Sequence, residues 1–407
     1  LIMMRKSFVF ALLLACSMTT AVAQQAKYVF YFIGDGMGLN QVNGTESFLA
    51  ELEGRIGIQK LCFPSFPYST FATSYSFSNG VTDSAAAGTA LATGVKTYNA
   101  AIGVGPDSLA VTSIAYLAKQ QGKKVGIGTT CSIDHATPAS FYAHQKHRDM
   151  YYEIGKELPA SDFDFFAGAD LRQPEKNGGP ELHQMIADAG YAVAYGLEEG
   201  KAAAKTAKKM FMTQTKEATA EYGNELPYAI DRRPGDLSLK QIVELGIEFL
   251  MKDNKKGFFL MAEGGKIDYA GHSDDGGACF REVQDLDEAV KVAFEFYKQH
   301  PKETLIVVTA DHETGGLGLG NGAYAQNLKV LQHQKASVAQ TTKKLAALRK
   351  DGHKPTWEEA KAVLGQCFGL FTKVEVNWRD EAELRKVFED RNGQTERSLY
   401  QSDDALA

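Results

Sequence analysis

The sequence has little cysteine, little proline and no long apolar run. Its 407 residues include five cysteines and 11 prolines, which excludes a disulfide-rich miniprotein and a collagen-like or proline-rich chain. No stretch approaches the roughly 20 consecutive apolar residues that a membrane-spanning helix needs. The formal net charge is −6 and no basic stripe stands out, so we do not expect a nucleic-acid partner. The chain is long enough to form one large α/β domain or two domains.

The N-terminus has the pattern of a secretory signal. An Arg-Lys pair precedes an apolar run at 8–15, and Ala-Val-Ala follows at 21–23. A basic segment, a short apolar segment and a small-x-small site are typical of a signal peptide. We therefore expect residues 1–23 to be a signal peptide and the protein to be periplasmic or secreted. Cys16 leaves open a second and less favoured interpretation, a lipoprotein.

The remaining cysteines follow no recognisable pattern. They are Cys62, Cys131, Cys279 and Cys367. Their spacing is irregular and includes no C-x₂-C metal-binding pair. An exported protein can form disulfides, but the sequence determines no pairing, and buried free thiols are the favoured interpretation.

Short β-rich runs alternate with helical patterns along the chain. The predicted strands are 28–33, 124–129, 191–195, 209–213, 257–261 and 304–309. The predicted helices are 108–121, 182–189, 238–254 (capped by Asp236) and 281–299, with an Ala/Lys-rich helix at 198–209. Such alternation predicts an α/β fold, a three-layer α/β/α sandwich around a mostly parallel central sheet. Segment 317–376 is polar and begins Gly-rich, so we expect it to be an insertion or cap on that sheet.

Three predicted strands run directly into acidic residues. Asp35 follows the first strand, Glu263 the fifth, and Asp311 and His312 the last. The carboxyl ends of parallel strands face one crevice, so we expect these side chains to meet there. Clustered carboxylates repel one another unless a cation lies among them. Each acid alone is explained by an ordinary turn, but the set predicts a divalent-metal site.

Asp268 and His272 add two further candidate ligands. They are four residues apart, which places them on one face of a helix. Mixed carboxylate and imidazole ligation is typical of zinc, and a catalytic zinc site keeps one position open.

Ser84 is the candidate nucleophile, in the segment TDSAAAGTA at 82–90. A hydroxyl at a helix N-terminus lies in positive potential beside free N–H groups that can hold a phosphate. The simpler alternative is that Ser84 caps an Ala-rich helix. No G-x-S-x-G segment is present, so activation by metal is expected rather than a hydrolase triad. Arg148 is a candidate for binding phosphate oxygens bidentately, or else a solvated surface residue.

Taken in order, these segments resemble the alkaline phosphatase family, the secreted metal-dependent phosphomonoesterases. The matching segments are GDGMG at 34–38, TDSAAAGTA at 82–90, HATPAS at 135–140, EGGKIDYAGH at 263–272 and TADHETGG at 309–316. The resemblance implies an alkaline-phosphatase-like fold and hydrolysis of small phosphate monoesters. It also implies a phosphoserine intermediate on Ser84, a phosphate clamp at Arg148, and a homodimer.

The resemblance also implies two zinc sites and a third, usually magnesium, site. The implied ligands are Asp35, Asp311 and His312 for one zinc, Asp268 and His272 for the other, and Asp35, Thr137 and Glu263 for magnesium. His135 occupies a position that is Asp in some members of the family and His in others. A histidine there is expected to shift the third site toward zinc.

The chain departs from the family near its C-terminus. The family completes the second zinc site with a histidine in a His-Thr or His-Ser motif, whereas His333 and His353 lie in neither pattern. We therefore expect residues 24–407 to form a catalytic domain whose C-terminal end is missing and whose second zinc site is incomplete. Two alternatives remain. One is a catalytically impaired or dead protein that binds phosphate or metal. The other is a sulfatase or phosphodiesterase of the same fold, although the sulfatase motif C/S-x-P-x-R is absent.

Overall fold

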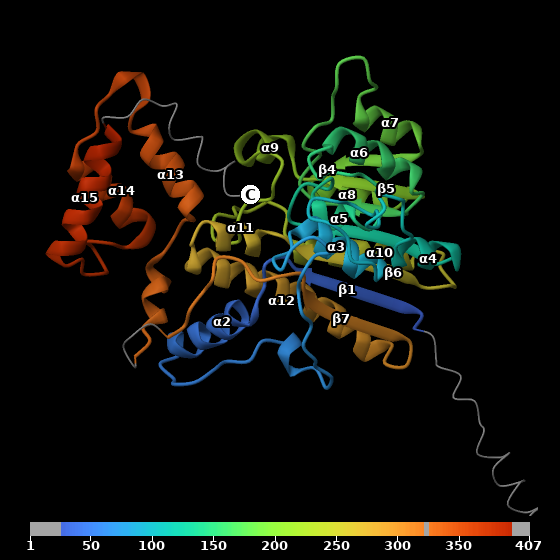
Figure 1. The fold of residues 1–407 in the computed structure, drawn as a ribbon, viewed down its shortest axis with the longest axis horizontal. Coiled ribbons are helices and arrows are strands. Elements are labelled where there is room, and N and C mark those ends of the chain that lie inside the picture. The colour runs from blue at the N-terminus through green and yellow to red at the C-terminus, as the bar shows by residue number, and fades with distance from the viewer. Residues whose placement is uncertain (1–25, 321–324, 393–407) are drawn as a thin grey trace, which may run out of the picture.

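A seven-stranded sheet forms the centre of the molecule (Figure 1). The structure is a computed structural model, and it describes residues 26–320 and 325–392. The strand order is β4-β5-β3-β2-β6-β1-β7, and every neighbouring pair is parallel. The strands are β1 (Tyr28–Gly34), β2 (Lys124–Thr129), β3 (Phe165–Ala167), β4 (Tyr191–Tyr195), β5 (Lys209–Thr213), β6 (Phe258–Gly264) and β7 (Thr304–Ala310). The predicted signal peptide at 1–23, with Cys16, lies outside the described residues.

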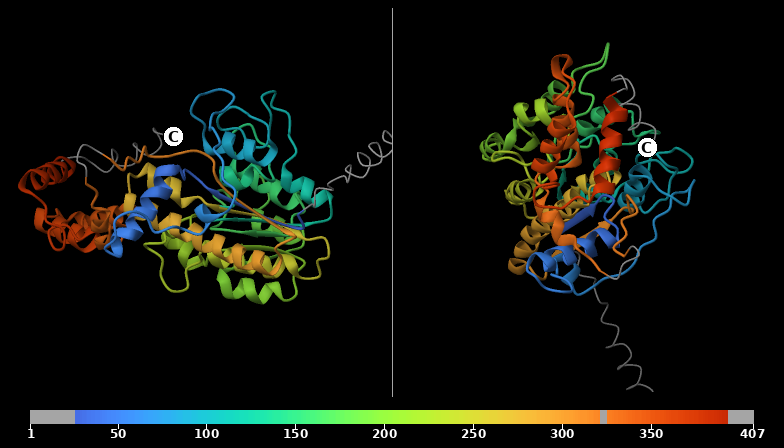
Figure 2. Two further views of the ribbon diagram at one scale, coloured as in Figure 1. Left: turned by 90° about the horizontal axis from the view of Figure 1, so that it is seen from below. Right: turned by 90° about the vertical axis from the view of Figure 1, so that its left-hand side faces the viewer.

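Helices cover both faces of this sheet and bury two separate apolar cores (Figures 1 and 2). Side chains alternate along β1, so that Phe30 and Phe32 belong to one core and Ile33 to the other. The first core contains α10 (Leu239–Met251) and α12 (Gly276–Gln299). The second contains α3 (Ser84–Thr93), α4 (Ile114–Gln120), α6 (Tyr151–Ala160) and α7 (Leu182–Asp188). The predicted three-layer α/β/α sandwich is confirmed.

All six predicted strands are present, but β3 was not predicted. It has three residues, pairs with β2 and β5, and is fully buried. A strand covered on both faces has no alternating pattern, and three residues are too few for a distinct apolar run.

One predicted helix start and one predicted cap are wrong because other side chains form the caps, and α12 begins at Gly276 rather than at 281. The hydroxyl of Ser113 accepts the Tyr116 N–H, so α4 begins at Ile114 and not at 108. Ser238 caps α10 in a capping box with Gln241, and not Asp236.

The remaining helices are shorter connections and an outer lobe. Within the body they are α2 (Leu39–Leu52), α5 (Ala136–Ala139), α8 (Gly196–Ala204), α9 (Lys216–Tyr222) and α11 (Lys266–His272). The outer lobe contains α13 (Val338–Ala347), α14 (Trp357–Phe368) and α15 (Trp378–Asn392), and projects to one side of the sheet (Figures 1 and 2). The segment 317–376, predicted to be a cap, contains the first two of these helices.

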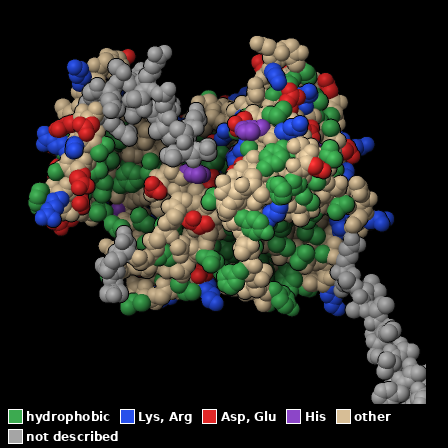
Figure 3. All heavy atoms as spheres, viewed as in Figure 1, with side chains coloured by type: hydrophobic (Ala, Val, Ile, Leu, Met, Phe, Trp, Pro, Cys, Tyr) green, Lys and Arg blue, Asp and Glu red, His purple; other side chains and the backbone are tan. Residues whose placement is uncertain are grey.

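The outer lobe is joined to the body through Asp275, the N-cap of α12. One Asp275 carboxylate oxygen accepts the Val338 N–H at 2.7 Å and the other accepts the Gln334 side-chain amide at 2.7 Å. On the face shown in Figure 3, acidic and basic side chains are interspersed over this lobe. No described helix is long and apolar enough to cross a membrane.

Candidate active site

The ends of three adjacent strands bring the predicted acids together. Strand β1 lies between β6 and β7, and its last residue pairs with the last residue of each neighbour. The three loops that follow therefore begin at the same level of the sheet. Asp35, Asp311 and His312 form one compact group, in which a ligand atom of each residue lies within 4.8 Å of the others.

A glycine in the first loop permits this close approach. Gly36 has a positive φ of 66°, and a Cβ on it would lie 2.7 Å from Thr314 Oγ1 and 2.9 Å from Asp268 Cα. Its N–H donates to Asp311 Oδ1 at 3.0 Å. Residue 36 therefore has to be glycine both for its backbone conformation and for space.

Ser84 is the first residue of α3 and lies beside this group. Asp83 caps the helix by accepting the Ala86 N–H at 3.0 Å, so the alternative interpretation of Ser84 as the cap is wrong. The Ser84 Oγ lies 3.4 Å from Asp35 Oδ1 and 3.3 Å from His312 Nε2. The hydroxyl is thus free of a capping role and lies at the positive end of a helix, next to two candidate metal ligands.

A second compact group contains Cys131, His135 and Glu263. The His135 Nδ1 lies 3.9 Å from Glu263 Oε1, while the Thr129 hydroxyl donates to the other Glu263 oxygen. Thr137 lies between the two groups and donates to Asp35 Oδ2 at 3.3 Å. Sequence reasoning missed Cys131 because it belongs to no metal-binding motif.

Burial and mutual repulsion raise the pKa values of the central carboxylates. Burial, followed by the charges of Asp311, Asp268 and Glu263, raises the pKa of Asp35 well above its ordinary value. Burial raises the pKa of Glu263 to about 7. A cation next to such buried carboxylates would stabilise their charged form.

Unpaired atoms within the two groups fit such cations. His135 Nδ1, Glu263 Oε1 and Asp311 Oδ2 are buried and have no hydrogen-bond partner among the described residues. Buried polar atoms normally find a partner, and nitrogen, oxygen and sulfur donors are the ligands of zinc. The residues present therefore fit divalent metal ions.

Asp268 and His272 lie on α11, at a more open edge of the site. The His272 Nε2 is 3.5 Å from Asp268 Oδ1, and the His272 side chain is 60% exposed. The Thr314 hydroxyl donates to the same Asp268 oxygen at 2.5 Å. Within the described ranges, no third His, Cys, Asp or Glu forms a compact group with this pair.

The two later histidines lie apart from this pair. His353 faces Glu359 in the outer lobe at 3.1 Å. His333 lies against Gly369, where a Cβ would come within 2.7 Å of the histidine Cβ. Neither histidine joins Asp268 and His272 in a compact group.

Arg148 lies within the site and is not a solvated surface residue. Its guanidinium donates to Asp83 Oδ2 at 3.2 Å and to His135 Nε2 at 3.1 Å, and its side chain is 24% exposed. These contacts place it beside the N-terminus of α3. Asp134, which directly precedes His135, belongs to neither compact group. Its carboxylate accepts the backbone N–H of Arg172 at 2.9 Å.

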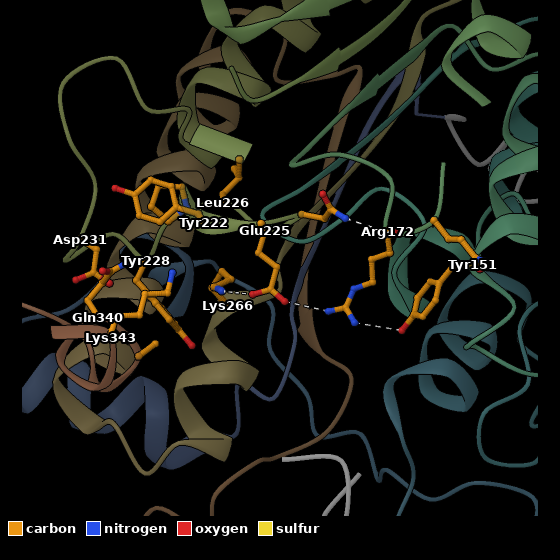
Figure 4. A pocket seen from close by; sticks show the side chains of 15 residues that line it. Tyr151, Arg172, Tyr222, Glu225, Leu226, Tyr228, Asp231, Lys266, Gln340 and Lys343 are labelled. Atoms are coloured by element: carbon orange, nitrogen blue, oxygen red, sulfur yellow. Dashed lines mark hydrogen bonds and ion pairs between the residues drawn. The ribbon is translucent and has the colours of Figure 1, made fainter. Parts of the chain in front are cut away.

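A pocket of about 730 Å³ has Arg172, Glu225 and Lys266 in its wall (Figure 4). Glu225 lies between two cations in it, at 2.7 Å from Lys266 and 2.9 Å from Arg172. Arg172 also donates to the Tyr269 hydroxyl at 3.0 Å, and the Tyr269 ring contacts the His135 ring at 5.8 Å between centroids. The pocket wall is thus one side chain away from the second compact group. Sequence reasoning missed Arg172 because no motif marks it, and it missed Tyr269 because only the ligand residues Asp268 and His272 were considered in the segment 263–272.

Comparisons with known proteins agree with this geometry. The family model "Alkaline phosphatase" matches residues 26–168 and 217–381. Alkaline phosphatase 4 of Bacillus subtilis is 35% identical over an alignment of 316 residues that covers 73% of this chain and 63% of that enzyme. The chain therefore spans less than two thirds of that relative's length.

Solved structures are similar over more of the chain. The cold-active alkaline phosphatase of Shewanella sp. has a TM-score of 0.74 and 29% identity, covering 90% of both chains. A variant of the alkaline phosphatase from the Antarctic bacterium TAB5, with a histidine replaced by glutamate, has Mg bound in its M3 site. It has a TM-score of 0.66 and 34% identity, covering 75% of this chain and 83% of that one. This chain belongs to the alkaline phosphatase family.

Proposed function

We propose that this chain hydrolyses phosphate monoesters through a phosphoserine intermediate on Ser84, at a site for two zinc ions and a third divalent ion. The position of the Ser84 Oγ supports the proposal most directly. It lies at the first turn of α3, 3.3 Å from His312 Nε2 and 3.4 Å from Asp35 Oδ1. A phosphate placed against this oxygen would also face the free N–H groups of the helix.

The reaction has two displacement steps at phosphorus. In the first, the Ser84 oxygen forms a bond to phosphorus, the bond to the ester oxygen breaks, and the alcohol leaves with a proton. In the second, water attacks the phosphoserine, phosphate leaves, and the serine oxygen regains a proton. Asp35 Oδ1 and His312 Nε2 face the Ser84 hydroxyl, and a metal ion held by these residues would help the hydroxyl to lose its proton.

The metal ions would be held by the groups described above. Asp35, Asp311 and His312 would hold one zinc ion, and Asp268 with His272 would contribute to the other. Glu263, Thr137 and Asp35 would bind the third ion. When bound, two close metal ions stabilise the entering and leaving oxygens of an in-line displacement.

Arg148 would bind the phosphate in both steps. Its contact with Asp83 holds the guanidinium beside the serine helix. A planar guanidinium can donate to two phosphate oxygens at once. The N-terminal pattern supports the further proposal that the enzyme acts in the periplasm or outside the cell on small soluble esters.

A second candidate function is binding of phosphate and metal with little turnover. It is favoured by the Asp268–His272 pair, because catalytic zinc usually has three protein ligands and the described residues supply two there. This candidate predicts zinc binding to the full chain without appreciable hydrolysis.

Turnover of 4-nitrophenyl phosphate by the zinc- and magnesium-loaded full chain tests the proposal. Replacing the nucleophile in Ser84→Ala should lower kcat by at least about a thousandfold. Ser337→Ala is the matched control, because Ser337 caps α13 in the outer lobe and should leave kcat unchanged. Full activity of Ser84→Ala would contradict the proposal, as would faster hydrolysis of bis(4-nitrophenyl) phosphate or 4-nitrophenyl sulfate. Tight zinc binding without turnover would select the second candidate.

A further inference from the structure

Cys131 lies in the metal site at a position that the family resemblance does not explain. Its sulfur and a ligand atom each from His135 and Glu263 all lie within 4.8 Å of one another. The three residues are 0%, 3% and 0% exposed. A buried thiol in such a group differs from an isolated structural cysteine, because two other metal-ligating side chains adjoin it.

Neighbouring residues hold the sulfur against the Glu263 carboxylate. A Cβ on Gly265 would lie 2.4 Å from Cys131 Sγ and 3.0 Å from Glu263 Oε1, so both atoms border the same point. The Thr129 hydroxyl oxygen accepts the Cys131 N–H at 2.9 Å, and this hydroxyl donates to the other Glu263 oxygen. One threonine thus positions two of the three side chains.

The other two side chains have unused ligand atoms that are buried. His135 Nδ1 and Glu263 Oε1 have no hydrogen-bond partner among the described residues, and they lie 3.9 Å apart. Leaving both atoms unpaired is costly, and binding of a cation would satisfy both. The two unpaired atoms are observed independently of the cysteine, and they also indicate a bound cation.

We propose that Cys131 and His135 Nδ1 bind the third metal ion together with Glu263 Oε1, in addition to the Thr137 and Asp35 oxygens named above. The site then prefers a borderline-soft ion such as zinc or cobalt to magnesium, because magnesium favours oxygen ligands and thiolates favour softer ions. The inference rests on the proposed function only in assigning a third metal to this place. It adds a ligand and a metal preference.

Binding has a defined proton balance. The Cys131 thiol loses its proton to solvent as sulfur bonds to the metal, and no electron is transferred. Because Arg148 can only donate, its bond to His135 Nε2 places the ring proton on Nδ1. Metal binding at Nδ1 moves this proton to Nε2 and ends that hydrogen bond. The Arg148 guanidinium is then free on this side to bind phosphate.

Cobalt absorption tests the proposal without substrate. The full chain is stripped with a chelator and reloaded with Co²⁺. Thiolate ligation gives an intense sulfur-to-cobalt charge-transfer band in the near ultraviolet, which imidazole and carboxylate ligands do not give. The native chain should show this band, and Cys131→Ala and the near-isosteric Cys131→Ser should lose it. Cys367→Ala, which removes a buried thiol of α14, should retain it.

Competition between zinc and magnesium provides the second measurement. The native chain should retain its third zinc in excess magnesium, whereas Cys131→Ser should bind that zinc about ten- to a hundredfold more weakly. Visible cobalt bands from the Asp35/Asp311/His312 site should persist in every variant and show that the variants are folded.

Failure of this inference differs from failure of the proposed function. Absence of the charge-transfer band in the native chain, or its persistence in Cys131→Ser, would overturn the role of Cys131. A normal band without phosphatase turnover would overturn the proposed function alone. Turnover without the band would overturn this inference alone.

Discussion

The two sides of the proposed metal site differ in how the fold supports them. Asp35 and Asp311 follow paired strands and are 0% and 5% exposed, and the backbone N–H of Gly36 holds the second carboxylate. His272 is the last residue of the seven-residue helix α11, and its side chain is 60% exposed. The strand ends thus provide two buried candidate ligands, whereas the helix provides one buried candidate ligand, Asp268, and one exposed one.

This difference has a physical cause. Asp35 follows β1, which lies between two strands and has a core on each face, and Asp311 follows the partly buried edge strand β7 and is held by the Gly36 N–H. A helix end frays more readily than a central strand, and Asp268 is restrained through the Thr314 hydroxyl. We therefore expect the strand-supported side to bind metal tightly and the helical side to bind it weakly.

The largest expected effect is that of Asp311→Asn. Its Oδ1 accepts N–H groups from Gly36 and His312, and its Oδ2 is unpaired. An asparagine can keep the first role but cannot provide the charged ligand. Zinc at a thousandfold excess over its Kd stabilises a protein by about 4 kcal/mol, and we expect the variant to lose most of the zinc-induced rise in Tm.

Calorimetry with and without zinc measures this effect. Asp285→Asn is the matched control, because Asp285 pairs with Arg232 at 2.8 Å outside the site. A zinc-induced rise in Asp311→Asn equal to that of the native chain would show that the strand-supported side is not a metal site.

His272→Ala should weaken only the second zinc. Its exposed imidazole is one ligand of a pair, and removing a direct ligand costs at least as much as removing a group that orients one, so we expect affinity at that site to fall at least about tenfold while one zinc stays tightly bound. Activity should recover at high zinc concentration. Zinc analysis against a competing chelator measures both ions, and loss of both together would mean that the two sides are not independent.

Arg148→Ala should weaken phosphate binding and leave both zinc ions of the Asp35/Asp311/His312 and Asp268/His272 groups in place. Removing a charged hydrogen-bond donor costs about 1.5–3 kcal/mol, which is about a ten- to a hundredfold weaker inhibition by phosphate. Arg233→Ala is the control, since Arg233 pairs with Glu221 at the surface. Unchanged phosphate inhibition would place the clamp elsewhere.

The smallest expected effect is that of replacing His183. This histidine lies outside the proposed metal site, and two carboxylates stabilise its protonated form. His183 lies 2.7 Å from Asp170 and 2.6 Å from Glu181, and the Asp170 hydrogen bond raises its pKa from 6.5 to about 9. A raised folded pKa stabilises the protein fully below pH 6.5, and this stabilisation is lost as the pH rises through about 9.

His183→Gln should therefore lower the free energy of unfolding by about 2 kcal/mol at pH 6. The difference should shrink toward pH 10, as followed by urea denaturation at each pH. A difference that is independent of pH would show that the protonated imidazole does not supply the stability.

The sequence predicted the strand-supported side better than the rest of the site. Buried parallel strands leave apolar runs, and the acids that follow them stand next to those runs in the chain. The partners of Arg148 and Cys131 could not be predicted, because Asp83 and Glu263 are distant in sequence and no motif links them. The short strand β3 and the cap at Ser238 depend likewise on packing that local patterns do not encode.

Trapping of the covalent intermediate tests the central claim most directly. The zinc-loaded full chain is incubated with radiolabelled inorganic phosphate at low pH, quenched in acid and digested, and the labelled peptide is identified. The account predicts zinc-dependent label on Ser84 that is absent from Ser84→Ala. Label on another residue, or a chain that turns over phosphate esters while Ser84 stays unlabelled, would contradict it.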